Sequence, residues 1–367
     1  MHYSSKRNNK IFILILSFLI LNIIIFPKPC MDGSLKGLKL FIQAVFPCLF
    51  PFLVLCNLII AFNGIELYAK LLGPILCKPL NLPTSCSVVI LLSFLCGYPM
   101  GAKYTSDLYE KKIIDFNTAE KLLNIASNAS PLFIMGTISM AMLNNKRLGY
   151  ILLISNYISC ILMGIILKTK NNLDIKNKTK FKHNFQTPTF SKAFSSSIED
   201  ALNISILVGG FVIFFSMITE IIRSNTILSI APHLKNKTLF SFLLGLLEIT
   251  NGCHSISSMV IPTELKLILI SFLISFSGLC IILQVYAFLY KYNFSIKKYV
   301  RRKFLQGILA AVISLGLYTI STNSRFSFAQ YSSNNYNINF SIYIIIVSLI
   351  LLIPLVYTKI KKLFNIL

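Results

Sequence analysis

The chain has 367 residues, of which 55% are hydrophobic and 13% are charged. This charged fraction is about half of that usual in soluble proteins, so the composition excludes an ordinary soluble domain. The net charge of +23 is a feature of many nucleic-acid-binding proteins. Here, however, the lysines stand in short loops beside apolar segments, where positive charge orients a membrane protein. We therefore expect an integral membrane protein that does not bind nucleic acid.

Long uncharged stretches run through the whole chain. A bilayer core requires about 20 apolar helical residues, so each stretch is long enough to cross. The first stretch follows Lys6, Arg7 and Lys10 like a signal peptide, but no cleavage site follows it, so we expect a retained helix. In chain order the uncharged stretches are 11–27, 40–62, 85–102, 122–143, 148–167, 201–219, 267–290, 304–322 and 339–358.

The positions of the basic residues favour one membrane topology. If 85–102 and 238–256 each enter and leave the membrane on the same side, 25 of the 35 Lys and Arg lie inside. If every segment crosses instead, only 19 do. Because positive residues collect on the cytoplasmic side, the first arrangement is preferred. The sequence thus predicts an all-α polytopic membrane protein with about eight transmembrane helices, two re-entrant hairpins and both termini in the cytoplasm.

The segment "LCGYPMGAK", residues 95–103, interrupts the first hairpin. Non-helical backbone at membrane depth is tolerated only where protein or a water-filled cavity satisfies its polar groups, so this break is a candidate cavity wall. The alternative is an ordinary helix end at the interface, with Lys103 reaching towards the headgroups. The candidate binding residues here are Gly97, Tyr98, Pro99, Gly101 and Lys103.

The second half repeats this pattern. "LLGLLEITNGC", residues 243–253, is again an apolar run with glycines and a polar interruption. Ser130 follows Gly97 by 33 residues, and Ser277 follows Gly245 by 32. Under the preferred topology the two units enter the membrane from opposite faces. This is an inverted-topology repeat, which many secondary transporters use to build a site from broken helices near the midplane.

Several polar residues near these breaks are candidates for substrate contact. Asn128 and Ser130 precede Pro131 and are expected to form the amino end of a half-helix, with Ser277 as the counterpart in the second unit. Their alternative role is helix packing, for which small residues are common in membranes. Tyr98 either stacks on an aromatic substrate or packs against apolar neighbours.

Glu248 stands after ten uncharged residues, 238–247. Carboxylates within membranes are costly and usually face a cavity, a partner or an ion path. We expect Glu248 to bind a coupling proton, since burial disfavours the ionised form, or to bind a coupling ion together with Asn251. Thr250 and Asn251 lie beside it as candidate substrate contacts. The alternative is a structural hydrogen bond from Glu248 to the broken backbone.

Four segments resemble the hallmark segments of YlbJ-type sporulation integral membrane proteins, whose gate-type repeats are related to concentrative nucleoside transporters. They are "FPCLFPFLVLCNLI" (46–59), "GYPMGAK" (97–103), "NASPLFIMG" (128–136) and "LLEITNG" (246–252). The resemblance spans about residues 40–290 and implies a role in endospore formation. It also implies movement of dipicolinate towards the forespore across the mother-cell-derived membrane. Pro131 departs from the family pattern, which has a small residue there.

Dipicolinate carries two carboxylates, so its transport requires positive compensation. Helix amino termini supply part of it, and Lys103 is the first candidate counter-charge, although its ordinary role would be topological. The expected segments are an N-terminal helix and outside loop (1–39), gate repeat 1 (40–168), a basic cytoplasmic loop (169–199), gate repeat 2 (200–322), and an outside loop with the last helix (323–367). The candidate protein partners are accessory sporulation membrane proteins and further copies of this chain in a homo-oligomer.

Three functional classes compete. The first is a dipicolinate transporter. The second is a transporter of a nucleoside or another small solute on the same scaffold, and the third is a non-transporting sporulation assembly protein. We expect no enzyme activity, since the chain has no His-Glu-x-x-His or phosphate-binding loop. The Ser277-Gly278 pair lacks a histidine in a later apolar segment to act as base. No motif for a cofactor or a metal is present.

Overall fold

The computed structural model describes residues 2–62, 64–167, 189–224 and 237–323, and every regular element in these ranges is helical. The first half has α1 (His2–Ile25), α2 (Pro27–Leu40), a π-turn (Phe41–Val45), α3 (Phe46–Ala61), α4 (Gly64–Leu76), a 3₁₀ turn (Thr84–Cys86), α5 (Ser87–Cys96), α6 (Met100–Glu110), α7 (Phe116–Ile125), the π-helix η3 (Phe133–Met142) and α8 (Lys146–Ile166). The second half has α9 (Phe190–Ser224), α11 (Lys237–Leu247), α12 (Ile249–Ser257), α13 (Thr263–Phe276), α14 (Gly278–Leu289) and α15 (Ile296–Asn323).

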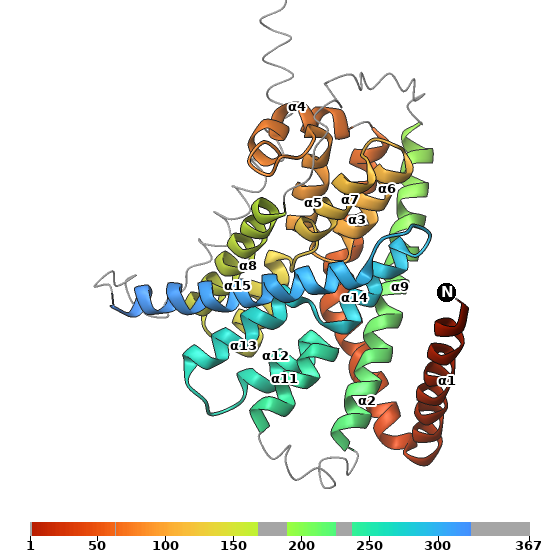
Figure 1. The fold of residues 1–367 in the computed structure, drawn as a ribbon, viewed down its shortest axis with the longest axis vertical. Coiled ribbons are helices and arrows are strands. Elements are labelled where there is room, and N and C mark those ends of the chain that lie inside the picture. The colour runs from red at the N-terminus through yellow and green to blue at the C-terminus, as the bar shows by residue number, and fades with distance from the viewer. Residues whose placement is uncertain (1, 63, 168–188, 225–236, 324–367) are drawn as a thin grey trace, which may run out of the picture.

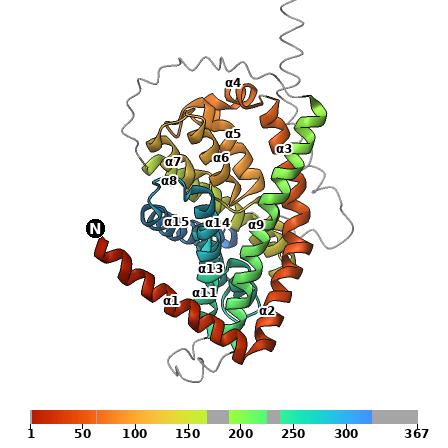
Figure 2. The ribbon, with the colours of Figure 1, turned by 90° about the vertical axis from the view of Figure 1, so that its right-hand side faces the viewer.

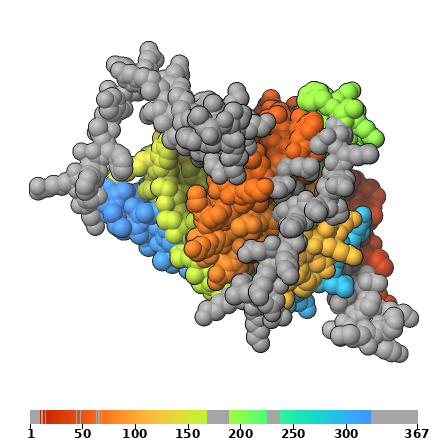
Figure 3. All heavy atoms as spheres, turned by 90° about the horizontal axis from the view of Figure 1, so that it is seen from above, coloured from red at the N-terminus to blue at the C-terminus, as the bar shows by residue number. Residues whose placement is uncertain are grey.

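One group of helices from each half lies at each end of α9. In Figures 1 and 2 the helices α4 to α7 gather towards one end of the long helix α9, and α11 and α12 gather towards its other end. α15 runs across the direction of α9 between these groups and packs on α8 and α13. From above, in Figure 3, the orange helices of the first half lie between the yellow-green α8 and the green end of α9.

The helical membrane architecture is confirmed in its coarse form. Four helical segments are long and apolar enough to cross a bilayer, with a fifth crossing if the bent pair Leu16–Ile25 and Pro27–Gln43 is one span. The bend between these two is 105°. Other expected crossings correspond to shorter apolar helices, and the expected crossing at 339–358 lies outside the described residues. The four long segments are Lys146–Ile166, Phe190–Ser224, Thr263–Leu289 and Ile296–Thr322.

The long helices bury their polar residues and expose apolar ones. On α8 the buried face carries Ser155, Asn156 and Ser159, while large apolar side chains such as Ile154 and Ile158 are exposed. This is the reverse of a water-soluble helix. A helix surrounded by lipid requires this arrangement, because its polar side chains find hydrogen-bond partners only inside the protein.

Residues 28–39 were expected to form an outside loop, but they belong to helix α2. α2 lies along α9, and Figure 2 shows the two running side by side. Gly33 and Gly37 stand four residues apart on the contact face: a Cβ atom at Gly33 would lie 2.9 Å from the Cα atom of Met217, and one at Gly37 would lie 2.8 Å from that of Ile213. This small-xxx-small spacing allows two membrane helices to approach closely.

We expect Gly37→Ala to destabilise the protein by about 1–3 kcal/mol, because the added methyl group meets the α9 backbone in a close-packed contact. Gly210→Ala is the matched control on α9, since no heavy atom lies within 4 Å of a Cβ atom there. Thermal unfolding of the purified variants measures both effects. Equal unfolding temperatures for the two variants would contradict the proposed α2–α9 contact.

Candidate functional site

The first break lies where the sequence predicts it. α5 ends at Cys96, and Gly97 has φ 79° and ψ −168°, a region that is essentially restricted to glycine. The Tyr98–Pro99 peptide is cis, and α6 begins at Met100. The Tyr98 N–H donates to the Asn128 carbonyl at 2.7 Å. This bond joins the first break directly to the next one.

That next break comprises residues 126–130, between α7 and the helical residues from Pro131 onwards. A Cβ atom at Gly97 would lie 2.6 Å from the Ser130 nitrogen, so only glycine permits this approach. Ser130 Oγ accepts from the Phe133 N–H at 3.2 Å and caps the following helix. Asn128 is fully buried, and its amide donates to the Ile125 carbonyl at 2.5 Å. Both residues therefore lie in the helix interruption, as expected.

Glu248 forms the third break, between α11 and α12. One carboxylate oxygen accepts from the Thr250 N–H at 2.9 Å and the other from the Asn251 N–H at 2.7 Å. Glu248 is 3% exposed. The carboxylate thus caps α12, where the partial positive charge of the helix end favours it. Glu248 thus forms the structural hydrogen bonds to the broken backbone that the sequence analysis gave as its alternative role. Its coupling role remains a prediction.

Ser277 is the fourth break, between α13 and α14. It has the left-handed conformation, with φ 82°, and the following Gly278 has φ 71°. A Cβ atom at Gly278 would lie 3.1 Å from the Gly245 carbonyl oxygen, so the fourth break packs against the third. The Ser277 hydroxyl is fully buried and has no hydrogen-bond partner in the part of the chain that the structure describes. Non-glycine residues in this conformation are strained and concentrate at functional sites.

The two pairs of breaks are connected through the helices that follow them. α6, after the first break, packs on α14, after the fourth, and α12, after the third, packs on η3, after the second. Among the described residues, the buried hydroxyl of Tyr98, like that of Ser277, has no hydrogen-bond partner. Each pair of breaks therefore contains one such hydroxyl group.

Lys103 is not a free cation. Its ammonium lies 2.6 Å from an Asp107 carboxylate oxygen and 5.4 Å from the centre of the Tyr104 ring. This ion pair reduces the positive charge that Lys103 offers to an anion. Pro99 and Gly101 lie at the start of α6, where a Cβ atom at Gly101 would overlap the Ala126 carbonyl. This close packing accounts for Gly101 without a ligand.

Sequence reasoning missed Lys303, which was counted among the cytoplasmic charges. Its side chain is fully buried on α15 and donates to the Ser127 carbonyl, inside the second break, and to Gln306 Oε1 at 2.8 Å. Gln306 in turn donates to Asn128 Oδ1 at 2.9 Å. The signal in the sequence is helical spacing, because one face of α15 carries a buried polar stripe: Tyr299, Lys303, Gln306 and Ser314.

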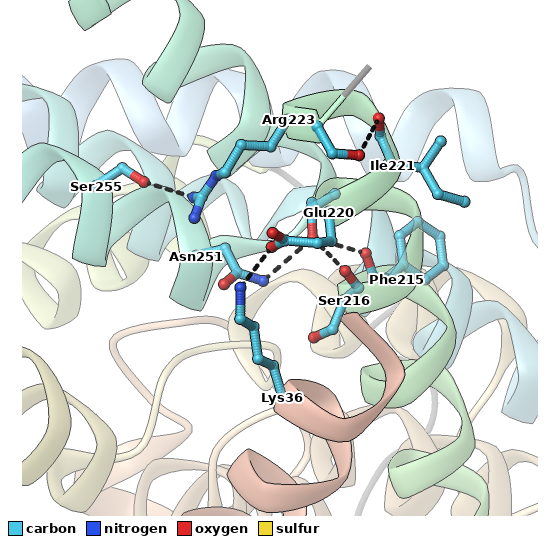
Figure 4. A network of polar contacts seen from close by, with 10 residues as sticks. Lys36, Phe215, Ser216, Glu220, Ile221, Arg223, Asn251 and Ser255 are labelled. Atoms are coloured by element: carbon cyan, nitrogen blue, oxygen red, sulfur yellow. Dashed lines mark hydrogen bonds and ion pairs between the residues drawn. The ribbon is translucent and has the colours of Figure 1, made fainter. Parts of the chain in front are cut away.

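A polar network holds α12 to the end of α9, as Figure 4 shows. The Asn251 amide donates to Thr219 Oγ1 at 3.3 Å, and Arg223 donates to Ser255 Oγ at 3.0 Å. Beside them Glu220 pairs with Lys36 of α2 at 3.0 Å. Asn251 therefore contacts the third break through its backbone and α9 through its side chain.

We expect Gly97→Ala to destabilise the protein by about 1–3 kcal/mol, because alanine is strained at this φ and ψ and its methyl group would meet the Ser130 nitrogen. Gly136→Ala is the control, since its nearest contact is an ordinary 3.7 Å. Thermal unfolding of purified protein measures the difference. A Gly97→Ala protein as stable as Gly136→Ala would show that the first break does not need glycine.

Comparison with known proteins identifies the same relatives as the sequence motifs. A family model described as Gate, nucleoside recognition, matches residues 42–169. The chain is 26% identical to the sporulation integral membrane protein YlbJ of Bacillus subtilis (strain 168), over 86% of this chain and 84% of that protein. No solved structure matches. The chain is therefore an integral membrane protein that is similar to YlbJ, and its residues 42–169 match the Gate model.

Proposed function

We propose that this protein is a secondary transporter that moves dipicolinate, a small aromatic dicarboxylate, across the membrane towards the forespore during sporulation. The observation that carries the transport proposal is the packing of four helix breaks in two pairs, which contact each other through α6 on α14 and α12 on η3. Discontinuous helices at a repeat interface are how many secondary transporters bind substrate. The sporulation setting is supported by the similarity to YlbJ, and the choice of dipicolinate rests on the sequence resemblance.

Reciprocal contacts between the halves support an inverted repeat. α6 of the first half packs on α14, and in the same way α12 of the second half packs on η3. The last helix of each half also binds the broken helix of the other: Gln306 of α15 donates to Asn128, and Asn156 of α8 accepts from Ser275 at 3.0 Å. An internal two-fold relation would produce such pairs of equivalent contacts.

Uptake of labelled dipicolinate into proteoliposomes that contain the purified protein tests this function. We expect saturable uptake of dipicolinate that exceeds both the uptake of labelled uridine and the signal from protein-free liposomes. Preferential uridine uptake would retain the scaffold and replace the substrate with a nucleoside, in keeping with the family description of the Gate segment. Uptake of neither solute by folded protein would favour the non-transporting assembly role.

Glu248 is the proposed coupling residue, because it is a buried carboxylate at the third break. Glu248→Gln keeps one carbonyl oxygen for the α12 cap but can no longer bind a proton or ligate a cation as a carboxylate. We expect dipicolinate binding to persist in this variant while the stimulation of uptake by an imposed proton or sodium gradient is lost. Uptake by wild type and variant is compared with and without each gradient. Gradient-driven uptake that survives the substitution would leave Glu248 with its capping role alone.

A further inference from the structure

The buried ammonium group of Lys303 has no carboxylate partner within the described part of the chain. Its two acceptors are neutral: the Ser127 carbonyl and the Gln306 side-chain amide oxygen. An ammonium group can donate three hydrogen bonds, so one donor remains. A buried charge without a counter-charge is costly, and a glutamine in its place would satisfy the same carbonyl without that cost. The positive charge of Lys303 therefore calls for a reason other than the hydrogen bond.

The position of Lys303 supplies that reason. It contacts the second break at Ser127, one residue before Asn128, which accepts the Tyr98 N–H of the first break. The Ser127 hydroxyl forms a 2.7 Å hydrogen bond with the Tyr299 hydroxyl on the same face of α15. A cation, an amide and hydroxyl groups thus converge on non-helical backbone. This set of donors matches a carboxylate, which accepts several hydrogen bonds and carries the opposite charge.

Little open space lies beside these donors around Lys303. A hollow of about 20 Å³ reaches Tyr299, with Asn124, Glu120 and Arg302 also in its wall. It has room for about one water molecule, and the Arg302 guanidinium lies 3.6 Å from a Glu120 carboxylate oxygen beside it. An aromatic dicarboxylate does not fit in this arrangement. Substrate binding there requires α7 and α15 to separate.

We propose that Lys303 is the cationic residue that binds a carboxylate of the transported anion. When α7 and α15 separate, this carboxylate takes the place of the Ser127 carbonyl as the acceptor of the hydrogen bond from Lys303. This proposal rests on the transport function and names the residue that selects an anionic substrate. Lys103, by contrast, already has Asp107 as its partner.

Equilibrium binding of labelled dipicolinate to the full-length protein in lipid nanodiscs tests this role. We expect Lys303→Gln to weaken binding at least tenfold and Lys303→Arg, which keeps the charge, to weaken it less. Pyridine-2,6-dimethanol, an uncharged analogue, should compete poorly with dipicolinate on wild type, and this preference should shrink in Lys303→Gln. Lys121→Gln is the matched control, because Lys121 is also buried and donates to a carbonyl, that of Leu80 at 2.5 Å. It should leave dipicolinate affinity unchanged.

A second variant tests the role without removing the lysine. Gln306→Glu places a carboxylate at the atom that now accepts from Lys303 at 2.8 Å. This internal anion should compete with substrate and weaken dipicolinate binding at least tenfold. The new ion pair offsets the hydrogen bond to Asn128 Oδ1 that a glutamate cannot donate, so the unfolding temperature should fall less than in the control. Gln284→Glu is the control, a buried glutamine bonded to Cys280 on α14. A carboxylate there has no such cation, so we expect its unfolding temperature to fall.

The outcomes separate this role from the choice of substrate. Wild-type affinity for dipicolinate in folded Lys303→Gln, or in Gln306→Glu if Lys303→Gln does not fold, overturns the role of Lys303 and leaves dipicolinate transport standing. An equal loss in Lys121→Gln overturns it as well. If wild type binds phthalate but not dipicolinate, and Lys303→Gln abolishes this binding, the anion site stands and dipicolinate is excluded. Binding of uridine alone, unaffected by Lys303→Gln, overturns both proposals.

Discussion

The structure depends on one constraint: backbone groups freed by a helix break inside the protein must find partners there. The first three breaks meet this requirement through another segment or through a side chain of their own. Tyr98 donates to the carbonyl of Asn128, Lys303 donates to that of Ser127, and Glu248 accepts from two backbone N–H groups. A buried polar group without a partner is costly in any protein and more so in lipid. Interlocking the breaks is therefore a condition for having them at all.

Close approach of the chain follows from this constraint and explains the glycines. Gly97 and Gly101 let the first break lie against residues 126–130, and Gly245 and Gly252 let the third break lie against its own hairpin. Larger residues would hold these segments apart and leave the freed backbone groups unpaired. The glycines of "GYPMGAK" and "LLEITNG" thus have a packing reason that is independent of any substrate.

Against this well-satisfied background a few groups stand out. Within residues 2–62, 64–167, 189–224 and 237–323, the hydroxyls of Tyr98 and Ser277 have no hydrogen-bond partner, and the ammonium of Lys303 has only neutral ones. Most polar groups around the breaks are paired, so these exceptions are informative. They also differ in kind: two are neutral groups that either donate or accept, and one is a cation. An anionic substrate with hydrogen-bonding capacity would bind both the neutral hydroxyl groups and the cation. The site would therefore select its ligand by charge.

The sequence by itself determined the class of the protein and the places where its helices break. Uncharged runs of membrane length, glycine and proline at 97–101, and a carboxylate at 248 are local signals, because they arise from what one segment can do alone. Tertiary structure decided which breaks meet and that residues 28–39 form a helix along α9. It also showed that Lys303 is buried at the second break rather than exposed in a basic loop. These facts were out of reach because the partners lie far apart along the chain, and a charge at a helix end looks the same in sequence whether it faces water or protein.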